Sequence, residues 1–328
     1  MDFKNDNKPL VNRIFNHKNI KAARSSSRTY ASTIRRVGNE FGGGYKPDLM
    51  WIKQPFLLQK IKKHDSSLNV KRNLVNAMII AFKLEPHDKL SEKFHKYLLE
   101  LNKQVDESNK SGILSEKQLK KTISFDKVVK LRKHLGKKLR LSQAMERKKI
   151  GSKDLKVINQ FVILCCYSMT APVRLDWASV TYHNKRGFAN IKEKGGNYLV
   201  LRKSSVTVYW NQYKTSKIHG STSTELPKDL ARVLRRHCKF MKTHFTDSNN
   251  LFLNARFEPM TRQNLGKLLE NLFFSYFKKR ISVSALRRIY LSSKYLKVTK
   301  EAKEDARKMM HSVGVARAHY VKEQVNDE

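Results

Sequence analysis

The sequence has few acidic residues, few cysteines and no long apolar run, and each shortage excludes a class of protein. Only 28 of its 328 residues are Asp or Glu, against 68 Lys and Arg, so the formal net charge is +40. This excess is untypical of a metabolic enzyme, and its self-repulsion opposes compaction unless a polyanion shares the surface. The phosphate backbone of a nucleic acid is the obvious polyanion, and an anionic membrane surface is the other candidate.

The apolar runs argue against a membrane partner, and the cysteines argue against a metal or disulfide scaffold. The longest apolar run covers residues 161–167, far below the ~20 residues that a bilayer-spanning helix needs. No apolar signal segment follows the first methionine, so we expect an intracellular protein. Cys165, Cys166 and Cys238 include no second pair at metal-ligand spacing. We therefore predict buried, reduced thiols and neither a zinc site nor a disulfide framework.

Hydrophobic periodicity predicts helices in the first third of the chain. Residues 1–24 are polar and basic without a sustained period, and we expect a flexible basic arm there. Beyond the arm, apolar residues recur at helical spacing in three segments: 27–41, 67–84 and 88–103. The run Gly42-Gly43-Gly44 ends the first of these helices. These segments predict a small all-helical domain over residues 25–104 with basic outer faces.

The rest of the chain mixes helices with a small sheet. A polar linker is predicted over residues 105–123, followed by a second domain over residues 124–328. Its helices are expected over residues 125–139, 153–169, 228–242, 261–277, 283–296, 300–310 and near Tyr320. β-Branched and aromatic residues predict strands over residues 188–192, 198–202, 206–213 and 221–226. The predicted fold class is therefore α+β, mainly α with a small antiparallel β-sheet.

Two basic residues of the second domain stand where a phosphate-handling site would need them. Arg174 follows an apolar helix and the break at Pro172, and an arginine at such a junction is costly unless it meets an anion. Lys214 ends a predicted strand near a turn, where a lysine can reach a phosphate as a mobile donor. Both also have an ordinary interpretation, a salt bridge from Arg174 to Asp176 and a solvated surface lysine.

Two pairs of residues near the carboxyl end add to this pattern. Ser284 and Arg287 stand three positions apart, so they share one helix face and can address one ligand together. His311 and Tyr320 stand nine positions apart, on opposite sides of a continuous helix. Both can serve one site only if the helix breaks between them, for which Gly314 is a suitable place. The ordinary interpretations are an exposed basic helix face and a tyrosine that anchors the end of the chain.

The order and spacing of these residues resemble the tyrosine recombinase, or phage integrase-like, family over most of the chain. That family has an arginine after an apolar helix, a lysine on a β-hairpin, a His-x-x-Arg helix, and a histidine nine residues before a nucleophilic tyrosine. The most specific matches are Leu286-Arg287-Arg288-Ile289-Tyr290 and the spacing from His311 to Tyr320. The helical segment over residues 27–101 resembles the SAM-like core-binding domain of the family. The implied catalytic residues are Arg174, Lys214, Ser284, Arg287, His311 and Tyr320.

The resemblance implies a site-specific recombinase or integrase that cuts and rejoins DNA through a covalent 3′-phosphotyrosine, without a cofactor or a metal. Arg174 and Arg287 would clamp the phosphate, and Lys214, or its neighbour Lys217, would protonate the departing 5′-oxygen. His311 would donate a hydrogen bond or help to deprotonate Tyr320, the nucleophile. The implied partner is double-stranded DNA, bound by a homotetramer on two sites, with no small-molecule substrate.

The chain departs from the family pattern, and the departures bear on its role. Ser284 stands where most members have histidine, and Pro172-Val173 replaces the usual Gly-x before the first arginine. Asp176 follows that arginine at two residues, where the family has a glutamate at three. This variant resembles members from large DNA viruses and eukaryotic mobile elements, which implies integration or excision of such a genome. The host nucleus and a viral replication compartment both stay open as the location.

Two alternative functions remain. A type IB topoisomerase uses similar arginines, lysine, histidine and tyrosine, and it also lacks histidine at the position of Ser284. The predicted helical amino-terminal domain favours a recombinase, because small viral-type topoisomerases begin with a β-rich domain. The other alternative is a non-catalytic basic DNA-binding protein. The presence of all the implied catalytic residues Arg174, Arg287, His311 and Tyr320 argues against it.

Overall fold

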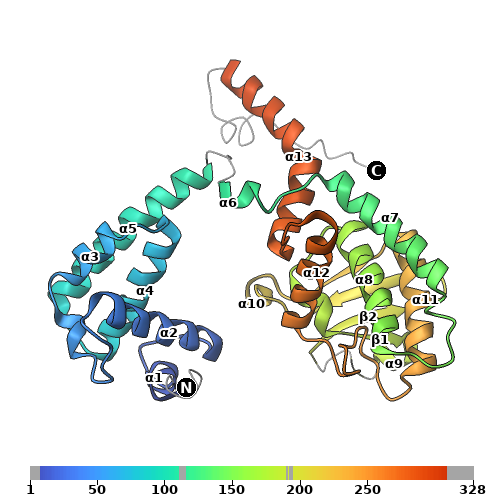
Figure 1. The fold of residues 1–328 in the computed structure, drawn as a ribbon, viewed down its shortest axis with the longest axis horizontal. Helices are drawn as coiled ribbons and strands as arrows, with labels where there is room; N and C mark the ends of the chain where they lie inside the picture. The colour runs from blue at the N-terminus through green and yellow to red at the C-terminus, as the bar shows by residue number, and fades with distance from the viewer. Residues whose placement is uncertain (1–7, 111–115, 190, 192–194, 309–328) are drawn as a thin grey trace, which may run out of the picture. The chain divides into compact units, whose positions relative to one another are not determined.

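The computed structural model describes residues 8–110, 116–189, 191 and 195–308, which belong to two compact units. The first unit covers Met1–Ile113 and the second covers Leu114–Glu328 (Figure 1). Two separate clusters of buried apolar side chains serve the two units. Each unit therefore buries a hydrophobic core of its own.

The described residues of the first unit form helices and loops. Its elements are α1 (Lys8–Phe15), α2 (Arg24–Phe41), the 3-10 helix η1 (Met50–Lys53), α3 (Leu57–Lys63), α4 (Leu68–Leu84) and α5 (Asp88–Lys110). Helix α4 packs against α1, α2 and α5. Its Leu74 and Ala77 are buried together with Ile34 of α2 and Phe94 of α5. The helices predicted over residues 27–41, 67–84 and 88–103 are therefore present, and the third is longer than predicted.

Two expectations about the ends of this unit are wrong. Lys8–Phe15 is a helix rather than part of a flexible arm, and its Leu10, Val11 and Ile14 are buried in the core. So short a segment shows no sustained period in the sequence, and its stability comes from packing against α2 and α4. At the other end, α5 continues to Lys110, so the first part of the predicted linker is helical.

The glycine run after α2 acts as predicted, for a reason that the structure makes specific. Gly42 caps the helix, and its backbone N–H donates to the carbonyls of Val37 and Gly38. A Cβ added at Gly42 would lie 2.6 Å from Cε3 of Trp51, so any side chain there would displace the indole. Gly43 has a φ of +72°, a left-handed conformation that glycine adopts without strain. The helix therefore ends where Trp51 packs against it.

The second unit combines helices with one four-stranded sheet. Its helices are α6 (Glu116–Leu119), α7 (Phe125–Ser142), α8 (Ser152–Ser168), the 3-10 helix η2 (Leu175–Ser179), α9 (Lys185–Ala189), α10 (Ser216–His219), α11 (Lys228–His244), α12 (Arg262–Phe277) and α13 (Val283–Lys308). Its strands are β1 (Val180–Asn184), β2 (Asn197–Leu201), β3 (Val206–Trp210) and β4 (Thr222–Glu225). The expected α+β class, mainly α with a small sheet, is confirmed.

The sheet is mixed rather than antiparallel throughout. Its strand order is β1-β2-β3-β4, and the last three strands form antiparallel pairs, as predicted. Strand β1 instead runs parallel to β2, with Val180 opposite Asn197. A parallel pair needs a crossover connection, and α9 stands between these two strands in the chain order. The strand predicted over residues 188–192 is wrong, because Phe188 belongs to α9 and the unpredicted β1 precedes it.

Helix α8 is the centre of the second core. It contacts α7, α11 and α12 (Figure 1). Along it, Ile158, Val162 and Tyr167 are fully buried. The three cysteines are buried as predicted, and burial raises the pKa of the Cys165 thiol to about 12. That thiol is therefore uncharged at neutral pH and packs as a small apolar group. None of the helices in the described part of the chain has the length and apolar character that a membrane crossing requires.

Helix α13 joins two segments that the sequence predicted as separate helices. It runs from Val283 through Lys308. Its first turns are anchored by Ala285, Leu286 and Ile289, which are buried against the core. From Leu291 onward its described side chains are mostly exposed. The anchored first turns of α13 are what fix the position of Arg287.

The buried His237 on α11 gives the second unit a measurable pH dependence. Its Nε2–H donates to the carbonyl oxygen of Leu251 at 2.7 Å, and burial lowers the pKa of the imidazole to about 4. The folded protein keeps this group neutral, while the unfolded chain protonates it near its ordinary pKa of about 6.5. The contribution of His237 to the unfolding free energy is therefore fully present above about pH 6.5. As the pH falls from 6.5 towards 4, this contribution decreases by up to about 3 kcal/mol.

We predict that His237→Gln, which keeps a donor for Leu251, flattens the dependence of the unfolding free energy on pH between pH 6.5 and 4. Urea unfolding at a series of pH values measures this. The exposed His219 provides the control, because His219→Gln leaves the dependence as it is. Equal slopes for the native chain and His237→Gln would contradict the assignment.

Candidate active site

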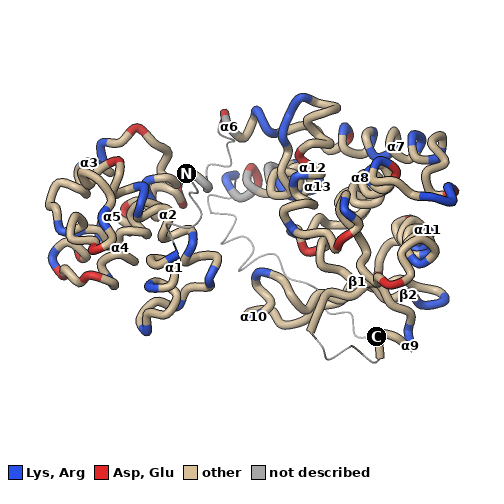
Figure 2. Tube along the Cα trace, turned by 60° about the horizontal axis from the view of Figure 1, so that its bottom comes forward, with Lys and Arg blue, Asp and Glu red and all other residues tan. Residues whose placement is uncertain are grey.

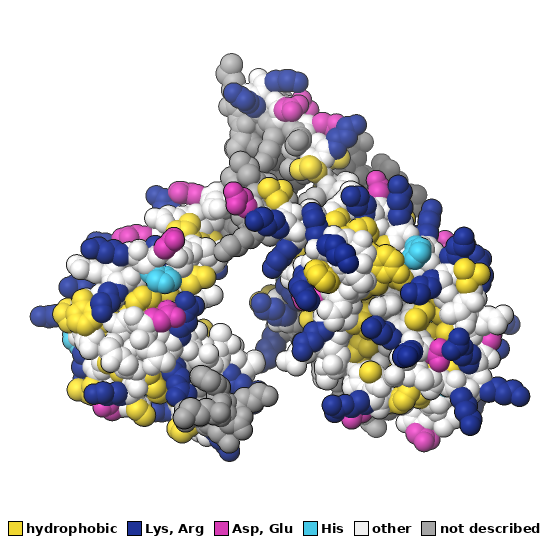
Figure 3. All heavy atoms as spheres, in the orientation of Figure 1, with side chains coloured by type: hydrophobic (Ala, Val, Ile, Leu, Met, Phe, Trp, Pro, Cys, Tyr) yellow, Lys and Arg dark blue, Asp and Glu magenta, His cyan; other side chains and the backbone are white. Residues whose placement is uncertain are grey.

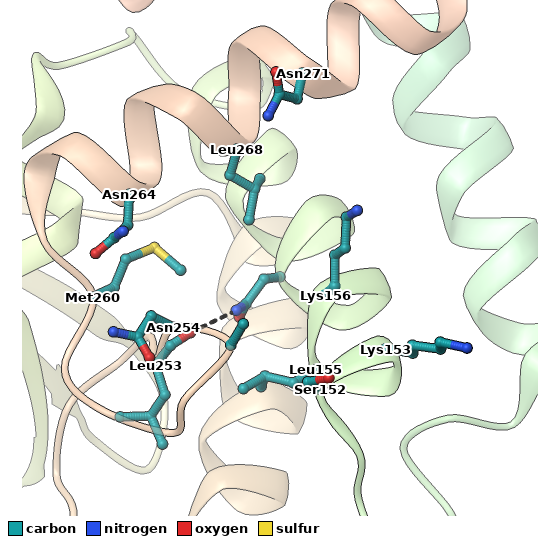
Figure 4. Close-up of a pocket in the computed structure, with 12 residues that line it drawn as sticks. Ser152, Lys153, Leu155, Lys156, Leu253, Asn254, Met260, Asn264, Leu268 and Asn271 are labelled. Atoms are coloured by element: carbon teal, nitrogen blue, oxygen red, sulfur yellow. Dashed lines mark hydrogen bonds between the residues drawn. The ribbon is translucent and has the colours of Figure 1, made fainter.

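One cavity of the second unit contains none of the residues that the sequence singled out. Its volume is ≈ 450 Å³, and α8, α12 and the segment between them line it (Figure 4). It is lined by Ser152, Lys153, Leu155, Lys156, Asn159, Leu253, Asn254, Ala255, Met260, Asn264, Leu268 and Asn271. This lining holds no arginine, histidine, carboxylate or tyrosine, and its cations are the lysines Lys153 and Lys156, so it offers no bidentate anion clamp.

A smaller cavity brings together two of the residues that the sequence singled out. It has a volume of ≈ 250 Å³, and both Arg174 and Arg287 line it. The other lining residues are Ala171, Pro172, Val173, Asp176, Trp210, Tyr213 and Thr222. We call this cavity the arginine cleft. Two guanidiniums in one cleft can bind a phosphate or carboxylate through parallel hydrogen bonds, so we take it as the candidate active site.

The backbone places Arg174 where α8 ends. Helix α8 stops at Ser168, Pro172 follows, and Arg174 caps the 3-10 helix η2. The hydroxyl of the buried Tyr167 donates to the carbonyl oxygen of Arg174. Burial raises the pKa of this phenol well above its usual value, so Tyr167 remains a donor. The last turn of α8 therefore holds the backbone from which the Arg174 side chain extends.

Arg287 reaches the same cleft from α13. Its neighbours Leu286 and Ile289 are buried, and its own side chain is half-buried. The Nε–H of Arg287 donates to the carbonyl oxygen of Pro172 at 3.1 Å. This hydrogen bond fixes the plane of the guanidinium beside the segment that carries Arg174. Both Nη groups remain outside any described hydrogen bond and can serve a ligand.

A buried carboxylate lies among the arginines. Asp176 is 4% exposed, and its Oδ1 accepts from Nη2 of Arg262 at 2.8 Å. Burial raises the pKa of this carboxyl, while the charges of Arg262, Arg174 and Arg287 act in the opposite direction. The sequence-based interpretation of Arg174 as the salt-bridge partner of Asp176 is therefore wrong, because Arg262 forms that salt bridge.

The predicted lysine and serine are near the cleft but do not line it. Lys214 is exposed in the loop between β3 and β4, where Tyr213 and Thr222 line the arginine cleft on either side of it. The Tyr213 hydroxyl donates to the carbonyl of Gly220 at 2.7 Å, which closes this loop. Ser284 is exposed on α13, one turn before Arg287. His311 and Tyr320 lie outside the described residues.

Sequence reasoning missed several residues that shape the cleft. Arg262 follows the Thr261 cap of α12 and meets Asp176 86 positions away, a pairing that no local pattern indicates. Tyr167 reads as core in the sequence, and its hydrogen bond to Arg174 depends on the chain reversal after α8. Tyr213 could have been found, because it directly precedes Lys214 at the end of a predicted strand.

The described residues leave the positive charge largely uncompensated. Figure 2 shows Lys and Arg along α7, α8 and α11 with few acidic residues between them, and Figure 3 shows the same excess on the visible faces of both units. Helix α7 alone carries Lys127, Lys130, Arg132, Lys133, Lys137, Lys138 and Arg140. Among the described residues, no group of His, Cys, Asp or Glu is arranged to hold a metal ion. The groups that these surfaces present to a ligand are therefore mainly the cationic side chains of Lys and Arg.

Comparison with known proteins adds one distant similarity. No family model matches the sequence, and no curated protein matches it. A solved structure described as the crystal structure of XerA recombinase is similar over 97% of this chain and 94% of that chain, with 12% sequence identity and a TM-score of 0.32. A TM-score this low carries no inference, so the proposals below rest on the residues of this chain.

We predict that Arg262→Ala destabilises the protein at neutral pH by about 1–2 kcal/mol, because it leaves the Asp176 carboxylate buried without its partner. The half-exposed position of Arg262 keeps the cost at this level through solvent screening. The deficit shrinks as the pH falls through the raised pKa of Asp176, since a protonated carboxyl needs no cation. Denaturant unfolding at neutral and acidic pH measures both effects.

The matched control is Arg232→Ala. Its partner Asp229 is 72% exposed, so this substitution changes stability by less than about 0.5 kcal/mol at either pH. An Arg262→Ala deficit that stays the same in acid would show that the lost stability is packing rather than charge.

Proposed function

We propose that this chain is a DNA strand-exchange enzyme, a site-specific recombinase or integrase that acts through a covalent 3′-phosphotyrosine. The observation that carries the proposal is that Arg174 and Arg287, from distant parts of the sequence, line one cleft. A scissile phosphodiester in that cleft would meet two guanidiniums, which suit the charge that builds on its non-bridging oxygens. The net charge of +40 supports double-stranded DNA as the partner.

In the proposed reaction, the phenolic oxygen of Tyr320 attacks the phosphorus and forms a new P–O bond, while the bond to the 5′-oxygen breaks. Lys214 gives a proton to the departing 5′-oxygen, and His311 assists loss of the tyrosine proton. The 5′-hydroxyl of another strand then attacks the phosphotyrosine in the reverse sense. The phosphodiester energy is kept in the covalent link, so the scheme needs no nucleotide cofactor, and the arginines supply the charge that a metal supplies elsewhere.

Several finer features belong to the same proposal. A chain of this kind would act as a homotetramer on two DNA sites, with the helical first unit serving as the DNA-binding core domain. Its resemblance to viral and mobile-element members supports integration or excision of such a genome. The helices of the first unit support a recombinase over a type IB topoisomerase, while the exposed Ser284 one turn before Arg287 favours the latter.

The covalent step gives the first test. A nicked suicide duplex made from the ends of the chain's own genetic element should trap a protein–DNA adduct that resists denaturant. Tyr320→Phe abolishes this adduct, because phenylalanine has no oxygen to attack the phosphorus. Tyr295→Phe, which removes an exposed hydroxyl on α13, leaves it intact. An adduct that survives Tyr320→Phe, or none with the native chain, would refute the catalytic assignment and leave a basic DNA-binding protein.

The general acid gives the second test. In a substrate with a sulfur in place of the 5′-oxygen, the leaving group departs without being protonated. Such a substrate therefore rescues a variant that lacks only the general acid. We predict that Lys214→Ala cleaves the ordinary substrate poorly and the sulfur substrate well, whereas Lys217→Ala cleaves the ordinary substrate like the native chain. Rescue of Lys217→Ala alone would assign the proton to the lysine on α10 instead.

An assay with supercoiled plasmid distinguishes a type IB topoisomerase from a recombinase. Relaxation by the native chain of a plasmid that has no cognate site would favour a type IB topoisomerase. A requirement for two cognate sites supports the recombinase.

A further inference from the structure

Two adjoining cavities of the second unit form a groove outside the arginine cleft. The cavity in Figure 4 has a volume of ≈ 450 Å³, and its neighbour has a volume of ≈ 390 Å³. Lys153 and Lys156 of α8 line both cavities, and side chains of α12 line both as well. We call the pair the α8–α12 groove. It shares no lining residue with the arginine cleft, so the proposed strand exchange makes no use of it.

A buried amide in the wall of this groove has an acceptor without a partner. Asn159 lines the first cavity and is 2% exposed. Its Nδ2–H donates to the carbonyl oxygen of Leu253 at 2.9 Å, the bond dashed in Figure 4. Its Oδ1 accepts no hydrogen bond from the described part of the chain. A buried oxygen in this state costs free energy, so the position favours a ligand that brings an N–H or O–H group.

Apolar side chains surround this acceptor. Leu155, Leu253 and Met260 line the same cavity and are buried. A flat heteroaromatic ring suits such a place, because its faces contact apolar side chains while its edge carries the hydrogen-bonding groups. The required donor therefore fits best on the edge of a ring.

The opposite wall of the groove supplies donors. On α12, Oδ1 of Asn264 accepts from the backbone N–H and the hydroxyl of Thr261, at 3.2 and 2.6 Å. Oδ1 of Asn271 accepts from Nη1 of Arg280 at 3.2 Å. These bonds fix the oxygens, so each amide presents its Nδ2 group as a donor. Among the described residues, nothing accepts a hydrogen bond from either Nδ2 group.

The far end of the groove is cationic. Figure 4 shows Lys153 and Lys156 on the side of the cavity away from Met260 and Asn264. Lys138 of α7 joins these two lysines in the second cavity. The residues that line the two cavities include no Asp or Glu. The groove therefore offers a neutral end that suits a ring and a charged end that suits an anion.

We propose that the α8–α12 groove binds a free adenine nucleotide. Adenine carries a single amino donor, N6, beside ring nitrogens that accept. In this arrangement N6 donates to Oδ1 of Asn159, and a ring nitrogen accepts from Nδ2 of Asn264. The phosphate groups extend to Lys138, Lys153 and Lys156, which bind them as point charges.

The chemistry of the groove favours a free nucleotide over a base within duplex DNA. Bases in a duplex are stacked and paired, and a protein pocket receives one only after it is extruded from the helix. A free nucleotide meets no such cost. The proposal is therefore independent of the proposed strand exchange, which requires no nucleotide.

The first experiment changes the ligand and leaves the protein as it is. Isothermal titration calorimetry with the full native chain, without DNA, measures the dissociation constants of adenosine, purine riboside and AMP. Purine riboside has hydrogen in place of the N6 amino group, so it leaves Oδ1 of Asn159 without its donor. We expect adenosine to bind at one site per chain and about tenfold more tightly than purine riboside. AMP binds more tightly than adenosine, and salt reduces this advantage.

The second experiment changes each end of the groove separately. Asn264→Asp keeps an oxygen for Thr261 and loses the Nδ2 donor, so it weakens adenosine binding about tenfold. Lys156→Ala brings the affinity for AMP towards that for adenosine and leaves adenosine binding unchanged. The matched control is Lys130→Ala, which removes an exposed lysine of α7 that lines neither cavity and changes neither affinity.

The proposal is overturned if adenosine and purine riboside bind equally, or if adenosine does not bind. Equal affinities for AMP and inorganic phosphate would also overturn it, because the lysines would then hold an anion without selecting a base. If Asn264→Asp unfolds, the comparison of adenosine with purine riboside still decides. Displacement of adenosine by duplex DNA would assign the groove to the DNA-contacting surface instead. The adduct assay with Tyr320 tests the proposed function separately, since it contains no nucleotide.

Discussion

The hydrogen bond from Nε of Arg287 to the carbonyl of Pro172 is the contact on which the arginine cleft depends, because it joins segments 115 positions apart. Helix α8 ends at Ser168, and Pro172 lies in the segment that follows, where its carbonyl oxygen accepts the hydrogen bond from Arg287. Arg287 takes that acceptor with one of its five donors and keeps the others for a ligand. In a similar way, the hydroxyl of Tyr167 donates to the carbonyl oxygen of Arg174 and holds the backbone there. The cleft is thus assembled from main-chain carbonyls at the end of one helix.

The electrostatics of the cleft follow from this crowding. Arg174, Arg262 and Arg287 act on a single buried carboxylate, Asp176, so the positive charge exceeds the negative charge around it. The three guanidiniums carry like charges, and the single carboxylate of Asp176 can compensate only one of them. The cleft therefore favours an anion as its ligand, and the net charge of the whole chain likewise favours a polyanion as its partner.

Local patterns predicted most of the elements, and long-range contacts account for what they missed. The apolar periodicity of α4 and α8 and the glycine run after α2 each indicate their structure within a few residues. Strand β1 was missed because its pairing with β2 is parallel and depends on a crossover, and α1 was missed because it is stable only against its neighbours. For the site, the junction at Arg174 was predictable from Pro172. The carbonyl that orients Arg287 and the partner of Asp176 were not, since both arise from packing between distant segments.

The net charge and the arginine cleft act at two levels in the proposed function. Cations hold any phosphate backbone with similar strength, so adding more of them raises affinity without raising selectivity. The net charge of +40 therefore accounts for attraction to a polyanion of any sequence, and it does not account for the choice of one phosphate. Under the proposed function that choice belongs to the arginine cleft, because Arg174 and Arg287 line it together.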